Sequence, residues 1–192
     1  MRTIDFTQPA NVVAPQLLGC VLTHGGVSLR ITEVEAYLGV DDPASHTYNG
    51  KTARNAAMFG PPGRFYVYVS YGIHYNSNIV CAPEGEGQGC LLRGGEVLTG
   101  EKVARKRRQR PDRAPIDFHN LARGPGNVGQ ALGLTLQDNG APVNLTVREA
   151  EPEWVAGPRI GISKNTAVPL RFWIPGEKSV STPRGRPTRR HL

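Results

Sequence analysis

The chain has 192 residues, of which 39% are apolar and 20% are charged, and its formal net charge is +7. This length suits one domain with a substantial core. A membrane-spanning helix would need an apolar run of about 18 residues, and no run approaches that length. Residues 1–5 also lack the apolar core of a secretion signal. We therefore expect a soluble, cytoplasmic protein with no membrane partner.

Short elements joined by tight turns are expected throughout, because the chain contains 16 Pro and 23 Gly. The predicted elements are a helix over 12–18, a hairpin of 21–23 with 27–31, a short helix within 53–59, strands at 65–71, 75–81 and 90–93, helices at 96–110 and 127–134, and closing strands at 159–163 and 170–174. This order favours a single compact α+β domain over 1–181, with a mixed, largely antiparallel β-sheet flanked by short helices.

The three cysteines, Cys20, Cys81 and Cys90, are odd in number and show no metal-ligand spacing. They indicate reduced thiols in an intracellular protein. We predict neither a structural disulfide nor a zinc site, and no cofactor.

The positive charge is concentrated in two segments. Residues 101–113 hold seven basic and two acidic side chains, a net +5, and the tail at 182–192 adds four arginines. The rest of the chain is close to neutral, which fits a polyanion binder better than a generally basic protein. A solvated helix face is the alternative for 101–113, and the Pro/Arg-rich tail is expected to be disordered.

Two carboxylates stand near the end of an extended segment that continues the first hairpin. Because side chains alternate along a strand, Glu33, Glu35 and Tyr37 are predicted to share one face with Leu29 and Ile31. A carboxylate in a partly dry cleft can act as a general base. We assign Glu33 to a structural ion pair with an arginine. We assign Glu35 to function, because Tyr37 is its neighbour and a histidine-containing loop follows.

His46, in that loop, would alone be a weak signal, since a lone histidine is usually structural. With the two glutamates it could suggest a metal site. A Glu-x-Glu pair with one distant histidine lacks a recognised ligand pattern, so we expect no metal.

An aromatic-rich strand is predicted at 65–71. Tyr66 and Tyr68 fall on one face, where they could either pack in the core or form a stacking wall worth about 1–3 kcal/mol per base. Tyr71 precedes Gly72, where the strand is expected to end. Its ring could therefore protrude as a wedge.

Several short motifs follow one another in a specific order. They are TEVEAYLG at 32–39, DDPASH at 41–46, RNAAMF at 54–59, PGRFYVYVSYG at 62–72, Asn78, LLR at 91–93, RGPG at 123–126, RIGI at 159–162 and PLRF at 169–172. In this combination they resemble the alkyladenine (3-methyladenine) DNA glycosylases, in their bacterial form. The resemblance extends from about residue 12 to residue 181.

The resemblance implies a catalytic pair. Glu35 would be the general base that activates water to attack the anomeric carbon of the deoxyribose. Arg93 and the backbone carbonyl of Ile160 would hold that water.

It also implies a pocket for a flipped base. Tyr37 and Tyr68 would sandwich the base, and His46 would hydrogen-bond its edge. Asn78 would crowd the amino group of guanine and so help to reject that base.

The remaining implied contacts are to DNA. Tyr71 would push into the minor groove and fill the vacated space, with Met58 nearby. Lys51, Thr52 and Arg54 would lie close to the phosphates.

The function implied is base-excision repair: release of alkylated or deaminated purines from double-stranded DNA by a monomer without lyase activity. Two alternatives stay open at this point. One is a protein that binds or flips bases without hydrolysis. The other is a hydrolase of free nucleosides, although basic segments and a wedge have no use in such an enzyme.

Overall fold

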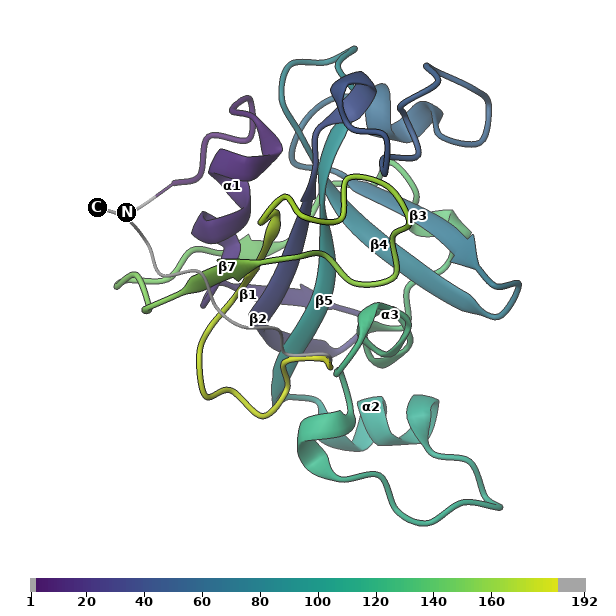
Figure 1. Ribbon diagram of the computed structural model, residues 1–192. Helices are drawn as coiled ribbons and strands as arrows, with labels where there is room; N and C mark the ends of the chain where they lie inside the picture. Colours follow the sequence, from purple (N-terminus) through teal and green to yellow (C-terminus); the bar gives the residue numbers. More distant parts are fainter. Residues whose placement is uncertain (1–2, 183–192) are drawn as a thin grey trace.

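The strands of the protein form one antiparallel sheet, seen in a computed structural model that describes residues 3–182 (Figure 1). The strands are β1 Val21–His24, β2 Val27–Tyr37, β3 Phe65–Ser70, β4 His74–Cys81, β5 Gln88–Thr99, β6 Leu145–Thr146, β7 Val155–Gly157 and β8 Arg171–Trp173. Six run in the order β3-β4-β5-β2-β1-β6, while β8 pairs with β2 and β7. Every strand pair is antiparallel. The predicted α+β fold is confirmed.

Within residues 3–182, three α-helices accompany the sheet: α1 Ala10–Leu17, α2 Glu101–Arg108 and α3 Pro125–Leu132. Short 3-10 turns at Gly39–Asp41, Ala56–Phe59, Phe118–Asn120 and Leu136–Asp138 complete the regular structure. Among residues 3–182, no helix is long and apolar enough to cross a membrane. The tail predicted to be disordered lies, from residue 183 onward, outside the described residues.

The sheet has a core face and a second face that carries the polar and aromatic residues of interest. On the core face, the apolar side chains of α1 and α3 join one buried cluster with Phe65 and Val67 of β3, Ile79 of β4 and Leu92 of β5. The residues between them point the other way. As a result, Tyr66, Asn78, Leu91 and Glu35 form one row across four adjacent strands.

Three register shifts interrupt the pairing of β2 with β5, and two of them are β-bulges on either side of Glu33. Ile31 pairs with Gly95 and Glu33 with Gly94, so Thr32 is an extra residue on β2. Val34 then pairs with Leu92, so the extra residue on β5 is Arg93. Bulges of this kind redirect side chains next to functional sites.

The first bulge corrects one prediction. Leu29 and Ile31 belong to the buried core, but beyond Thr32 the core positions become Val34 and Ala36. The prediction that Glu33, Glu35 and Tyr37 share a face with Leu29 and Ile31 is therefore wrong. The extra residue moves the two carboxylates to the opposite face.

Most predicted elements are present, with two exceptions. The helix predicted at 96–110 begins only at Glu101, because β5 continues to Thr99 with Val97 in the core. Gly100 separates the two elements with a φ of 78°, and a Cβ there would lie 2.1 Å from the carbonyl oxygen of Gly26.

The second exception is the strand predicted at 159–163, which does not form. Its place as a closing strand is taken by β7. Arg159 instead inserts its side chain into the protein, where it is 5% exposed. Gly161 follows in the left-handed region, with a φ of 75°. The segment is thus a loop that covers the polar face of the sheet.

Candidate active site

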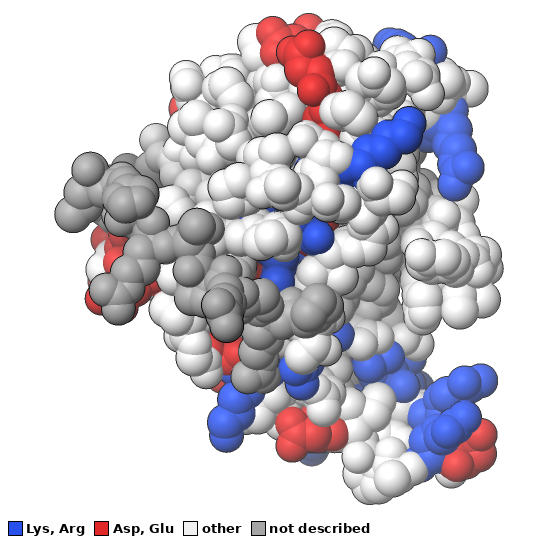
Figure 2. Space-filling model, viewed as in Figure 1, with Lys and Arg blue, Asp and Glu red and all other residues white. Residues whose placement is uncertain are grey.

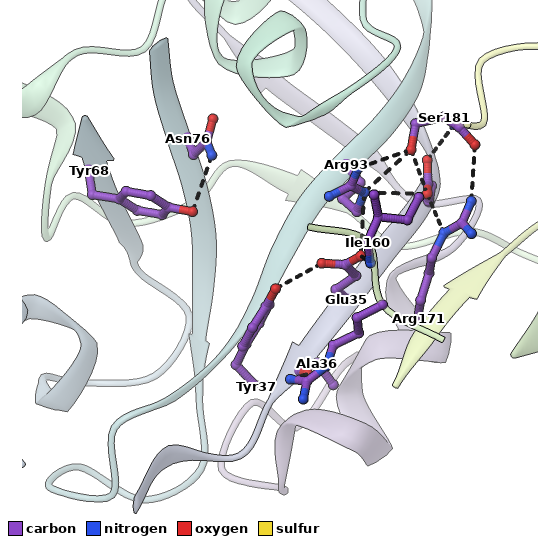
Figure 3. Close-up of polar contacts among 11 residues, drawn as sticks. Glu35, Ala36, Tyr37, Tyr68, Asn76, Arg93, Ile160, Arg171 and Ser181 are labelled. Atoms are coloured by element: carbon purple, nitrogen blue, oxygen red, sulfur yellow. Dashed lines mark hydrogen bonds and ion pairs between the residues drawn. The ribbon is translucent and has the colours of Figure 1, made fainter. Parts of the chain in front are cut away.

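Glu35 lies on β2 with no exposed surface. The hydroxyl of Tyr37 donates a hydrogen bond to its Oε2 at 2.9 Å, and the backbone amide of Ile160 donates to its Oε1 at 2.7 Å. Nε of Arg93 lies 3.5 Å from the same Oε1 (Figure 3). Donors from two strands and from the 159–163 loop thus orient one buried carboxylate.

Burial raises the pKa of the Glu35 carboxyl above its ordinary value. The positive charge of Arg93 and the hydrogen bonds from Ile160 and Tyr37 oppose this rise without cancelling it. A carboxylate with a raised pKa is a better proton acceptor near neutral pH. Glu35 therefore has the properties expected of a general base.

Glu33 makes the structural ion pair that was predicted for it. Its Oε1 lies 2.6 Å from Nε of Arg171 and accepts a hydrogen bond of 2.8 Å from the hydroxyl of Ser181. The amide of Ser181 donates to Oε2 at 2.6 Å. Glu33 thus joins β2, β8 and the segment after β8. Nε of Arg93 lies 3.5 Å from Oε1 of Glu33 and also 3.5 Å from Oε1 of Glu35, so Arg93 faces both carboxylates.

A cavity of about 530 Å³ opens beside this carboxylate network. Eight of the residues expected in the site line it: Tyr37, His46, Met58, Tyr68, Tyr71, Asn78, Arg93 and Ile160. Glu35 itself stands behind the wall formed by Tyr37 and Arg93. The volume falls in the range of small-molecule and base pockets.

The Tyr37 ring, which forms part of this wall, packs against the side chain of Arg159. The guanidinium of Arg159 lies 4.6 Å from the ring centroid. Arg159 also makes a fully buried ion pair with Asp42, with Nη1–Oδ2 and Nη2–Oδ1 distances of 2.5 and 2.8 Å. Both belong to motifs quoted above, DDPASH and RIGI, but sequence reasoning assigned neither a role.

The ionisation states in this group follow from their surroundings. Burial would raise the pKa of Asp42, yet hydrogen bonds from Arg159 and Asn165 bring it below the ordinary value. For Tyr37, burial and the negative Glu35 raise the pKa far above the physiological range. Tyr37 therefore remains a hydrogen-bond donor to Glu35.

Three more rings, those of Tyr66, Tyr68 and His46, form a cluster at the cavity, which Tyr68 and His46 line. Tyr66 and Tyr68 of β3 are stacked, with centroids 5.4 Å apart and an interplanar angle of 25°. His46 meets Tyr68 edge-on at 4.6 Å, and its Nδ1 lies 3.3 Å from the hydroxyl of Tyr66. Burial and the nearby Arg54 lower the pKa of His46. The imidazole is thus neutral at neutral pH and can both donate and accept a hydrogen bond.

Asn78 and Met58 form a buried part of the cavity lining, 3% and 2% exposed. A Cβ at Gly89 would approach the methyl group of Met58 to 3.1 Å and Cβ of Asn78 to 3.4 Å. The glycine therefore leaves room for both. Met58 packs with Tyr66 and Val80 and lines the same cavity as Tyr71.

Tyr71 stands at the rim, at the tip of the β3–β4 hairpin. It is 91% exposed and has a φ of 50°, and Gly72 follows with a φ of 71°. The amide of Ile73 donates to the carbonyl of Ser70 at 3.2 Å. Two consecutive positive φ values make this a type I′ turn. A non-glycine residue held in this strained region is often functional.

The residues expected near phosphates lie in an adjacent loop, where Lys51, Thr52 and Arg54 are all exposed. Thr52 and Arg54 line a second cavity of about 270 Å³, which shares His46 with the first. Asn55, which sequence reasoning missed, donates at 3.0 Å to the carbonyl of His46 and so ties the two loops together.

Sequence reasoning also missed Lys164, which lines the first cavity from the loop after Ile160 and is exposed. Within residues 3–182 there is no group of three or more His, Cys, Asp or Glu side chains placed to hold a metal ion.

The fold and the site together define a protein with a buried carboxylate beside an aromatic cavity. The family model for methylpurine-DNA glycosylase (MPG) matches residues 4–178. The chain therefore belongs to the methylpurine-DNA glycosylase family, and the resemblance noted in the sequence is confirmed.

Relatives in other bacteria are similar over nearly their whole length. One from Corynebacterium efficiens is 61% identical over 192 residues, covering 97% of this chain and 98% of its own. One from Corynebacterium glutamicum is 62% identical over 189 residues, with 96% and 98% covered. One from Cutibacterium acnes is 47% identical over 194 residues, with 94% and 99% covered. All three are provisionally named 3-methyladenine DNA glycosylases.

Proposed function

We propose that this protein is a base-excision-repair DNA glycosylase that flips an alkylated or deaminated purine out of duplex DNA and hydrolyses its N-glycosidic bond. One observation carries the proposal. A fully buried glutamate with a raised pKa stands directly behind an aromatic cavity of about 530 Å³. A protein that only bound bases would have no use for such a carboxylate.

In this proposal the flipped base lies between Tyr37 and Tyr68. The neutral imidazole of His46 hydrogen-bonds the edge of the base, and Asn78 crowds the amino group of a normal guanine. The support is that all four side chains line one cavity. Stacking is worth about 1–3 kcal/mol per base, comparable with the few kcal/mol that base flipping costs.

Tyr71 enters the duplex as the base leaves it. Its 91% exposure at the rim of the cavity supports this role. Lys51, Thr52 and Arg54 contact the flanking phosphates from the neighbouring loop. Met58 lies near Tyr71 in this step, which is supported by the fact that both line the same cavity.

The chemistry is a hydrolysis through an oxocarbenium-like state. The C1′–N bond breaks and its electron pair leaves with the base, while the water oxygen bonds to C1′ and its proton passes to Glu35. Arg93 and the carbonyl of Ile160 hold the water, and the Glu35 carboxylate also stabilises the positive sugar. An alkylated purine that is already cationic needs no protonation to leave.

The proposed enzyme has no lyase activity. A Schiff-base lysine needs a deprotonated amine, which proteins usually obtain by desolvation. Lys164 lines the cavity but is exposed. Borohydride should therefore trap no enzyme–DNA adduct, and an adduct lost in Lys164→Ala would contradict this part of the proposal.

The test is single-turnover base release from two duplexes, one containing alkylated purines and one a single hypoxanthine. Wild type should release base, and the ratio between the duplexes defines the substrate class. Glu35→Gln should release none while binding damaged DNA nearly as well. Tight binding without release by wild type would instead indicate a binding protein, and release from free nucleosides alone would indicate a nucleoside hydrolase.

A further inference from the structure

The basic helix α2 contains two kinds of cation. Three of its arginines bind the body of the protein: Arg105 the carbonyl of Ile116, Arg107 the carbonyls of Ala131 and Gly25, and Arg108 the carbonyl of Leu121, all at 2.7–2.9 Å. Arg105 also pairs with Glu101 at 2.7 Å. These arginines hold the helix in place, so they explain only part of the charge in 101–113.

The other cations point away. Lys102, Lys106 and Arg110 are exposed, and within residues 3–182 none of their side chains makes a hydrogen bond or an ion pair. The spacing of four residues places Lys102 and Lys106 on one helix face, and Arg110 follows two residues after the helix ends at Arg108. We call these three residues the basic stripe.

Folding alone gives no reason for the basic stripe. Like charges four residues apart on a helix repel. Lys102 also lies in the first turn, where the helix dipole disfavours a positive charge. Such mutually repelling cations are expected at a surface that binds a polyanion, because the negative charge of the partner offsets their repulsion.

The basic stripe is connected to the proposed DNA site through α3. Helix α2 packs on α3, and Pro125 at the start of α3 lines the cavity. Gly126 packs against His74, close to the hairpin tip that carries Tyr71. Helix α3 has eight residues and is therefore about 12 Å long. Because its first residue lines the cavity and α2 packs on it, α2 lies several base pairs from a nucleotide flipped into the cavity.

The surface agrees with this arrangement. In Figure 2, Lys and Arg side chains occur above and below the uncharged right-hand edge, where Figure 1 places the β3–β4 hairpin. The lower group lies in the region of α2 and has red Asp or Glu atoms beside the blue ones. A duplex centred on the hairpin tip would therefore meet positive charge on both sides.

We propose that the basic stripe of Lys102, Lys106 and Arg110 binds the phosphate backbone of the duplex several base pairs from the lesion. The inference rests on the proposed function. It adds a second electrostatic contact to the one proposed for Lys51, Thr52 and Arg54. The proposed partner of the basic stripe is therefore double-stranded DNA that extends beyond the lesion on at least one side.

The test is the salt dependence of binding to a long lesion-containing duplex. Each phosphate contact contributes about 0.9 to the slope of log K against log salt concentration. Changing all three residues to Gln should lower the slope by about 2.7, and each single change by about 0.9. Between 50 and 200 mM salt, the triple variant should lose about 40-fold less affinity than wild type.

Two controls make the result specific. Lys178→Gln removes an exposed charge in the loop after β8, and should leave the slope unchanged. A duplex with only about three base pairs on either side of the lesion should give the same slope for wild type and the triple variant. The single-turnover release rate at saturating enzyme and low salt should also be the same for both, because the stripe lies outside the cavity.

An equal slope for wild type and all stripe variants on the long duplex would overturn the inference and make the stripe a solvated helix face. A lower slope together with no base release by wild type would refute the glycosylase proposal while leaving the stripe as a DNA contact. The two proposals can therefore fail separately.

Discussion

Replacing Arg159 by methionine should strongly destabilise the protein, because Arg159 and Asp42 form an ion pair in which both side chains are fully buried. Methionine leaves the Asp42 carboxylate without its bidentate partner and the carbonyl of Ala36 without a donor at 2.9 Å. Removing one partner of such a pair destabilises proteins by about 3–5 kcal/mol. For a chain of this length, that corresponds to a Tm lower by roughly 6–20 °C.

The assay is thermal and denaturant unfolding at neutral pH, with the same substitution at an exposed site as the control. Arg113 pairs with Asp112 at 3.9 Å and both side chains are 71% exposed, so Arg113→Met should change stability by at most about 1 kcal/mol. Adding Asp42→Asn to Arg159→Met should recover part of the loss, since it removes the unpaired charge. A Tm for Arg159→Met equal to that of Arg113→Met would refute the reasoning.

The effect should depend on pH with a definite sign. The pKa of Asp42 is lowered in the folded protein, so its contribution to stability is present above the ordinary carboxyl pKa and disappears as pH falls through the lowered value. The stability difference between wild type and Arg159→Met should therefore shrink in acid. Base release should also fall by about 10- to 100-fold. Arg159 packs against the Tyr37 ring and precedes Ile160 in the chain, and Tyr37 and Ile160 are the two residues that donate hydrogen bonds to Glu35.

Two further predictions concern the reaction. Because the pKa of Glu35 is raised, release of a permanently cationic base such as 7-methylguanine should decline as pH falls through a midpoint above the ordinary glutamate value. Arg93→Met, which removes a charge that lowers this pKa, should move the midpoint to higher pH. A pH profile that does not respond to Arg93→Met would argue against Glu35 as the base. Tyr71→Ala should slow release from normally paired duplexes more than from mispaired ones, where flipping costs less. Equal slowing on both, measured in single turnovers, would remove the wedge role.

Local patterns in the sequence determined much of the fold. The alternating residues of 65–71 predicted β3, and its partner β4 followed directly in the chain. The hairpin of β1 and β2 was predicted from two extended runs around His24-Gly25-Gly26. These elements form between neighbours in sequence, so their side-chain alternation and turn residues are sufficient to predict them. The aromatic and acidic residues of the site were likewise recognised from motifs.

Tertiary structure decided what surrounds those residues. Which face Glu35 occupies depends on the bulge at Thr32, and this bulge exists only when β2 pairs with β5. The Asp42–Arg159 pair joins residues 117 positions apart, at a distance where no local periodicity applies. The basic residues of 101–110 form one run of positive charge in the sequence, and only the carbonyls that the fold brings near Arg105, Arg107 and Arg108 distinguish these structural arginines from the basic stripe. Sequence thus determined which chemical groups are available, and long-range pairing determined which of them are buried, paired or exposed.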